Sequence, residues 1–65
     1  MSYAFKEVKS SGGKECQITH HNSTVDMVKV SLPELLTDLN QEGWEIVHVA
    51  MWDTNTAVLL RLEEE

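Results

Sequence analysis

The sequence predicts a small α+β domain, with an antiparallel sheet of about three to five strands packed on one face by a single helix. Three observations predict this class. Leucines at helical spacing occupy residues 32–42, the apolar period changes to two after Gly43, and a looser alternation fills the first third of the chain. The 65 residues are expected to form one domain, 1–65, with a thin core. A chain of this size hides only about 60% of the surface that its unfolded form exposes.

The strongest local signal is the helix at residues 32–42. Ser31 is expected to be its N-cap, with Pro33 in the first turn and Glu34 at the third helical position, an arrangement typical of a capping box. Gly43 follows as a residue able to take positive φ and end the helix. The helix is amphipathic, because leucines recur three, four and seven residues apart. Its apolar side consists of Leu32, Leu35, Leu36 and Leu39.

A C-terminal β-hairpin is expected over residues 44–62, with turn residues at 53–56 and a register that pairs Trp52 with Ala57. This register sorts the side chains onto two faces. The apolar face, the expected seat of the helix, carries Val47, Val49, Met51, Val58, Leu60 and Leu62. The other face carries Trp44, Ile46, His48, Ala50 and Trp52 opposite Ala57, Leu59 and Arg61. This second face is too apolar to lie in water, so we expect another molecule to cover it.

The first third of the chain predicts shorter strands. Residues 2–9 alternate loosely and indicate a strand, residues 10–13 form a flexible turn, and residues 15–20 and 25–30 indicate two more strands around a turn at 21–24. The sequence leaves open how these strands are ordered in the sheet.

Composition narrows the possible partners. The 11 acidic and 5 basic residues give a net charge of −6, which repels nucleic acid and anionic membranes.

Cys16 is the single cysteine, so no disulfide forms within the chain, and without a leader-like segment we expect a reducing cytoplasm. Cys16 is interpreted as a small apolar strand residue. Residues 63–65 are expected to be a frayed acidic tail.

Two segments resemble a known family. The opening strand Tyr3-Ala4-Phe5-Lys6-Glu7-Val8 and the junction Glu42-Gly43-Trp44-Glu45-Ile46 at the end of the leucine-rich helix are similar to those of domain of unknown function 4177, a family of short bacterial and phage proteins. The resemblance covers most of the chain except residues 12–30. It implies a compact α+β fold, no established activity and no catalytic residues. Trp44 is also explained physically, as a residue packed at the corner between helix and strand.

Few residues point to chemistry. His20 and His21 with Cys16 suggest a metal site, but in a strand Cys16 and His20 lie about 13 Å apart and adjacent histidines point to opposite faces, so no metal or other cofactor is expected. His48 is the candidate general acid or base, with Arg61 directly opposite in the predicted register. An ordinary contact at a dimer interface is the simpler explanation of this pair. The candidate ligand or interface residues are Trp52, His48, Arg61, Ile46, Leu59, His20 and His21.

Three hypotheses for function follow from these observations. The first is a non-catalytic oligomeric binding module, bacterial or from a phage, that acts stoichiometrically by sequestering a small molecule or capping a protein partner at surfaces between subunits. The alternative is an acidic regulator of a basic protein partner, whose binding would weaken with salt. The least favoured is a small enzyme that uses His48. A homo-oligomer is expected because a core this thin benefits from a partner subunit.

Overall fold

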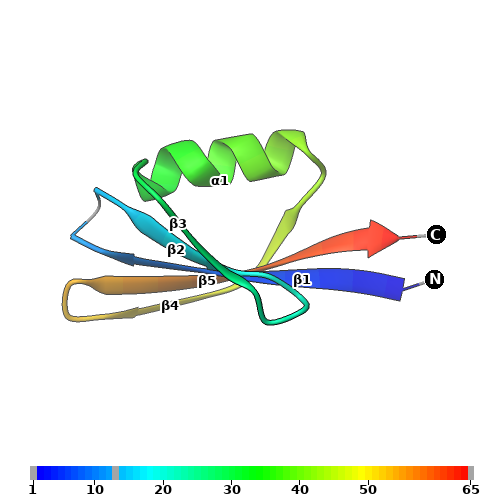
Figure 1. Cartoon of the computed structure of the whole chain (residues 1–65), viewed down its shortest axis with the longest axis horizontal. Helices are drawn as coiled ribbons and strands as arrows, with labels where there is room; N and C mark the ends of the chain where they lie inside the picture. Colours follow the sequence, from blue (N-terminus) through cyan, green and yellow to red (C-terminus); the bar gives the residue numbers. More distant parts are fainter. Residues whose placement is uncertain (1, 13, 65) are drawn as a thin grey trace.

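The computed structural model describes residues 2–12 and 14–64. It contains a five-stranded antiparallel sheet and one helix, which confirms the predicted α+β class (Figure 1). The elements are β1 (Ser2–Ser11), β2 (Cys16–Thr19), β3 (Val25–Val28), α1 (Leu32–Gln41), β4 (Glu45–Trp52) and β5 (Asn55–Glu64). Their order in the sheet is β3-β2-β1-β5-β4, so β1 and β5 are central and β3 and β4 are the two edge strands.

The two long central strands pair along their whole length, from Ser2 with Glu64 to Ser11 with Asn55. This ladder makes β1 longer than the predicted strand at residues 2–9. It also corrects the prediction of a frayed tail: Glu63 and Glu64 continue β5 opposite Tyr3 and Ser2, because β1 gives their backbone groups partners. Glu65, the last residue of that predicted tail, lies outside the described residues. Both ends of the described chain therefore lie side by side (Figure 1).

The N-terminus of α1 differs in detail from the prediction. Ser31 is the N-cap, with extended backbone, and its carbonyl accepts the N–H of Leu35 at 3.0 Å. Its side chain makes no capping hydrogen bond, so the predicted capping box is not formed. Pro33 explains part of this difference, because an N-cap side chain bonds the N–H of the second or third helical residue and proline at the second has none.

The C-terminus of α1 ends as predicted at Gly43, which has φ 101°. The Gly43 N–H donates to the Asn40 carbonyl and the Trp44 N–H to the Leu39 carbonyl, both at 3.0 Å. This pair of bonds is a Schellman motif, which satisfies carbonyls left open at the helix end. Trp44 and Leu39 are both buried, and the apolar contact expected for this motif joins α1 to the start of β4.

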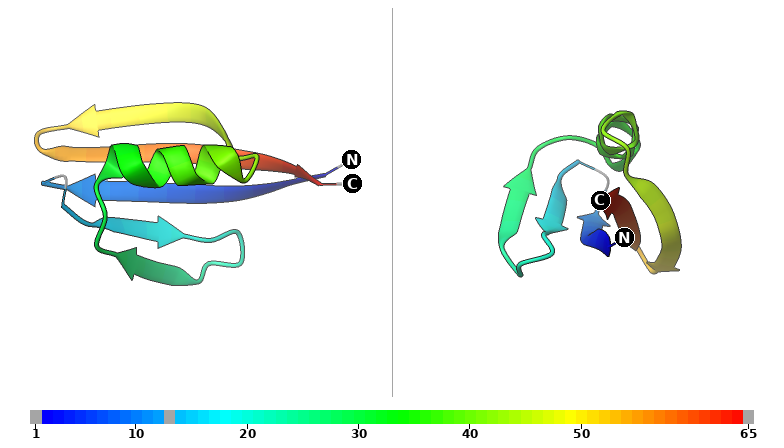
Figure 2. Two further views of the ribbon diagram at one scale, coloured as in Figure 1. Left: turned by 90° about the horizontal axis from the view of Figure 1, so that it is seen from above. Right: turned by 90° about the vertical axis from the view of Figure 1, so that its right-hand side faces the viewer.

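The buried apolar residues form one cluster, to which both α1 and the strands contribute. Seen from above, α1 lies over β1 and β5, while β4 lies beyond the helix (Figure 2, left). Leu35 and Leu39 of α1 belong to one buried cluster with residues of four other segments. The cluster consists of Val8, Cys16, Ile18, Leu35, Leu39, Trp44, Val58 and Leu60.

The register of β4 and β5 differs from the predicted one by two residues. Trp52 pairs with Asn55 rather than with Ala57, so the turn consists of Asp53 and Thr54 alone. Asp53 has φ 52°, which few residues other than glycine, asparagine and aspartate adopt readily. The ability of aspartate to take this conformation allows a turn centred one residue earlier than the predicted one, which changes the pairing by two residues.

A bulge between Ile46 and His48 changes the faces of β4. Beyond the bulge Ile46 pairs with Leu60, on the side of the sheet that faces α1, and Trp44 is buried in the core. The prediction that both residues share a face with His48 and Trp52 is therefore wrong. An extra residue in one strand reverses the alternation of side chains on either side of it, and this bulge has no glycine that would have revealed it.

Candidate functional site

The sheet face opposite the core cluster is uncovered within the described residues, and we call it the open face. Its members follow from the strand pairings, since residues opposite each other in a ladder share a face. They include Tyr3, Phe5, Glu7, Lys9, Gln17, Thr19, Val25, Met27, Asn55, Ala57, Leu59, Arg61, His48, Ala50 and Trp52.

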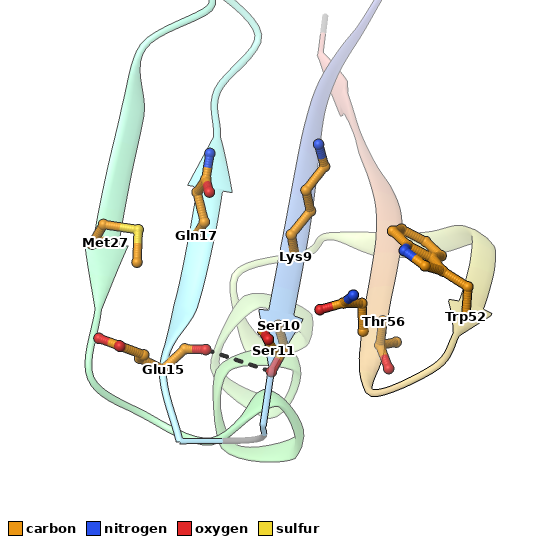
Figure 3. A pocket seen from close by; sticks show the side chains of 9 residues that line it. Lys9, Ser10, Ser11, Glu15, Gln17, Met27, Trp52 and Thr56 are labelled. Atoms are coloured by element: carbon orange, nitrogen blue, oxygen red, sulfur yellow. Dashed lines mark hydrogen bonds between the residues drawn. The ribbon is translucent and has the colours of Figure 1, made fainter.

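One end of the open face contains a cavity of about 260 Å³, which we call the Trp52 hollow (Figure 3). Trp52 of β4 and Met27 of β3 both line it. A flat sheet would separate these two edge strands by about 19 Å, at about 4.8 Å per strand. The two edge strands nevertheless both contribute side chains to this one cavity.

Between these two walls the hollow is polar. Lys9 of β1, Gln17 of β2 and Asn55 of β5 line it, together with Glu15 in the turn before β2. The Lys9 ammonium lies 3.3 Å from the carboxylate of Glu7, and both side chains are about half exposed. Lys9 therefore brings its positive charge to the hollow with a carboxylate already beside it.

The other end of the open face holds an aromatic row. The backbone N–H of Phe5 donates to His21 Nδ1 at 3.2 Å, and the two rings are stacked with centroids 6.1 Å apart. Tyr3 lies 6.5 Å from Phe5 between ring centroids, and the Arg61 guanidinium lies 4.9 Å from the centre of the Tyr3 ring. Phe5 lies just before Glu7, where β1 begins to pair with β2. Its hydrogen bond to His21 therefore joins the turn after β2 to β1.

The two remaining histidines, His20 and His48, lie in different parts of the sheet and have different neighbours. His20 Nε2 lies 2.7 Å from Asp26 Oδ2, which joins the two ends of the β2–β3 turn. His48 is exposed and pairs with Leu59, whereas Arg61 pairs with Glu45 and lies 3.5 Å from its carboxylate. The predicted opposition of His48 and Arg61 is therefore wrong, because the register differs by two residues.

The predicted site residues are thus brought together only in part. Leu59, His20 and His21 line one shallow depression, beside Phe5. Trp52 lies in its own hollow, Arg61 packs on Tyr3, and Ile46 is on the opposite face of the sheet. Among residues 2–12 and 14–64, no cluster of three or more His, Cys, Asp or Glu residues is placed to hold a metal ion.

Cys16 is buried in the core, as its interpretation as an apolar strand residue predicts. Burial raises the pKa of its thiol, and a hydrogen bond with Ser10 lowers that pKa in part. The Cys16 Sγ donates to the Val30 carbonyl at 3.4 Å. A buried thiol with a raised pKa is a poor nucleophile at neutral pH.

The edge strand β4 is the most exposed apolar element of the molecule. It contains no lysine, arginine or proline, the residues that usually protect an edge strand from pairing with another chain. Its side chains are exposed on both faces of the sheet, apart from that of Ala50, which is partly buried. The exposed apolar residues of β4 are Ile46, Val47, Val49, Met51 and Trp52.

Sequence reasoning missed the polar residues of the Trp52 hollow. Lys9, Gln17 and Met27 join Trp52 only because β1 and β2 lie between the two edge strands. The strands predicted at residues 15–20 and 25–30 contained part of the signal, since a strand assignment fixes the face of its own strand on which Gln17 or Met27 lies. The order of the strands, which the sequence left open, was needed to put those faces together.

The part of the chain that the structure describes has no helix of the length and apolarity needed to cross a membrane. No family model, no curated protein and no solved structure matches this chain. The similarity to domain of unknown function 4177 stays a prediction.

Proposed function

We propose that this protein is a non-catalytic binding module that self-associates through β4 and acts stoichiometrically, by holding a small molecule or capping a protein partner. The helix packed on one face of the sheet and the C-terminal hairpin form the scaffold of this module. The observation that carries the proposal is the exposure of β4, an eight-residue edge strand with apolar side chains on both faces.

A second copy of the chain is the partner that suits β4. An edge strand presents a row of unpaired N–H and C=O groups, which another β4 could satisfy by antiparallel pairing. Such a contact is self-complementary, as a two-fold interface requires. It would also place the uncovered side chains of Ile46, Val49 and Met51 against their counterparts in the other copy. The net charge of −6 on each chain opposes association, but Glu45 is the only acidic residue in β4 itself.

The absence of catalysis in this proposal rests on what surrounds the reactive groups. The Cys16 thiol is buried with a raised pKa, and the Nε2 atom of His20 is occupied by Asp26. His48 is exposed, and Leu59 rather than Arg61 lies opposite it. General acid–base catalysis needs a group held in a shielded site with its pKa tuned to the task.

Native mass spectrometry and sedimentation test the oligomeric state. We expect a homo-oligomer at micromolar concentration and a monomer for Met51→Lys, since Met51 is 77% exposed and a lysine there places charge in the β4 contact. Val25→Lys adds the same charge at an exposed apolar residue of β3, the opposite edge strand, and should remain oligomeric. Circular dichroism should show both variants folded. A monomeric wild type, or a Met51→Lys variant as oligomeric as the control, would contradict the proposal.

A second candidate function is an acidic regulator of a basic protein partner. It is favoured by Glu34, Asp38 and Glu42, which are exposed and recur every four residues along α1. Residues at this spacing lie on one side of a helix. Salt separates the candidates: binding through this acidic surface should weaken strongly between 50 mM and about 500 mM salt, whereas association through apolar β4 should not.

A further inference from the structure

Resting on the proposed binding function, we propose that the Trp52 hollow binds an uncharged planar heteroaromatic molecule of one or two fused rings. The ring would stack on the indole of Trp52, and its polar edge would meet the amides of Gln17 and Asn55.

The exposure of Trp52 is the first argument. The two tryptophans of the chain have opposite environments, because Trp44 is 7% exposed in the core and Trp52 is 48% exposed beside the hollow. Packing therefore accounts for Trp44 but leaves an indole face of Trp52 in water. Flat aromatic rings stack on such a face at little entropic cost, since tryptophan has only two side-chain torsions to fix.

The size and the opposite wall limit the ligand further. Ligand pockets for drug-sized molecules have volumes of about 300–1,000 Å³, so a hollow of about 260 Å³ suits a smaller molecule. Met27 faces this space from the other edge of the sheet (Figure 3). A thioether is polarisable and makes favourable contacts with aromatic rings, so Met27 gives the far side of the hollow a surface suited to such a ligand.

The polar groups of the hollow define the edge chemistry. The side-chain amides of Gln17 and Asn55 each offer a carbonyl acceptor and an NH₂ donor. Within the described residues, neither amide takes part in the side-chain hydrogen bonds of the molecule. A heteroaromatic ring with adjacent donor and acceptor atoms, such as a free nucleobase or an aromatic carboxamide, can bond to an amide at both atoms.

Charge argues for a neutral ligand. Lys9 and Glu15 bring one charge of each sign to the lining, and Lys9 already lies 3.3 Å from Glu7. The protein as a whole carries −6. A phosphate or carboxylate on the ligand would meet this negative field without a free cation to compensate for it. The same ring should therefore bind more weakly when it carries a phosphate.

Fluorescence of Trp52 provides the test. The protein is titrated with free adenine, uracil and nicotinamide, and with two controls: adenosine monophosphate, which differs from adenosine by a charged phosphate alone and is compared with it, and cyclohexanecarboxamide, which keeps the amide but lacks a planar ring. We expect saturable quenching by at least one of the three ring probes, no saturable response to cyclohexanecarboxamide, and weaker binding of adenosine monophosphate than of adenosine. Failure of all three rings to saturate up to about 10 mM, a limit well above ordinary ligand affinities, would overturn the inference.

Variants connect the signal to the hollow. Trp52→Leu should abolish binding, measured by ligand-observed NMR because the remaining tryptophan, Trp44, is buried in the core and does not report on the hollow. Gln17→Ala should raise the Kd about three- to tenfold, the effect of one hydrogen bond. Glu63→Ala, an exposed change on the open face distant from the hollow, should leave the Kd unchanged. Equal affinity in Trp52→Leu and wild type would overturn the inference.

The two proposals fail separately. An oligomer that binds none of the three ring probes overturns the ligand class and leaves self-association through β4 intact. A monomeric wild type that binds adenine in a Trp52-dependent way supports the ligand class and overturns self-association.

Discussion

Replacing Gly43 with alanine should destabilise the protein by about 1–3 kcal/mol, and two features of the site set this range. Gly43 has φ 101°, a conformation that costs an L-residue about 1–2 kcal/mol. A Cβ at this position would lie 3.1 Å from Cδ1 of Leu62, so the Leu62 side chain must move. Leu62 is only partly buried, which favours the lower end of the overpacking cost of about 1–3 kcal/mol. Alanine also restricts the unfolded chain more than glycine does, and this effect offsets the loss of stability by about 0.4–1 kcal/mol.

Gly12 is the matched control for this substitution. It also has positive φ, 76°, but a Cβ there would meet no atom within 4 Å. Gly12→Ala therefore carries the backbone cost and the same gain from the unfolded chain, without the contact to Leu62. Its expected loss is about 0–1.5 kcal/mol.

Urea denaturation monitored by circular dichroism measures both variants at one fixed protein concentration, since self-association would stabilise the folded state. With a slope of about 1 kcal/mol per M for a domain this small, the midpoint should fall by about 1–3 M for Gly43→Ala. Equal losses for the two variants would show that the contact with Leu62 contributes nothing. An unchanged midpoint for Gly43→Ala would refute the reasoning from backbone conformation as well.

Three further predictions concern the core and the surface. Leu60→Ala should cost about 2–5 kcal/mol, because Leu60 is fully buried, whereas Leu59→Ala on the open face should cost less than half as much in the same denaturation assay. The Cys16 thiol should react with iodoacetamide far more slowly in the native protein than in urea. Because burial raises its pKa above the usual 9.0, the stabilisation is complete below pH 9.0 and is lost as the pH rises above it, and Cys16→Ala should remove this alkaline loss. Glu45→Gln should change stability by about 0–1 kcal/mol, since its ion pair with Arg61 is exposed, and a larger loss would contradict that reading.

The features predicted correctly from the sequence are those encoded within a few residues. The leucine spacing and Gly43 place the helix and its end, because a Schellman motif depends on neighbouring residues alone. The burial of Trp44 and Cys16 also follows from their local position.

The features predicted wrongly depend on single backbone conformations. Asp53 takes positive φ and moves the turn, which separates His48 from Arg61. The bulge then moves Ile46 to the other face. Neither conformation follows from residue types, because aspartate adopts positive φ only in some turns and a bulge without glycine has no composition of its own. The prediction of a β4 covered by α1 failed for a different reason: one helix of ten residues covers only the central strands.

The candidate site could be predicted only as separate residues. Trp52 was recognised because a large aromatic residue beside a turn has little reason to be buried. The amide of Gln17 and the thioether of Met27 lie in the same hollow as Trp52 because of the order of the strands in the sheet. That order depends on pairings between segments that are distant in the sequence. Local periodicity contains no information on such pairings.

The central position of the β1–β5 ladder has a consequence for folding kinetics. Its strands come from opposite ends of the described chain, so a long loop must close before their contacts form. Folding rates fall as the sequence separation of contacts rises, whereas hairpins form within about 1–10 μs. The β4–β5 hairpin should therefore exist before β1 arrives, with both of its edges unpaired. In concentrated refolding mixtures a β1 strand from another molecule can fill the place beside β5, which makes strand exchange the expected error of this topology.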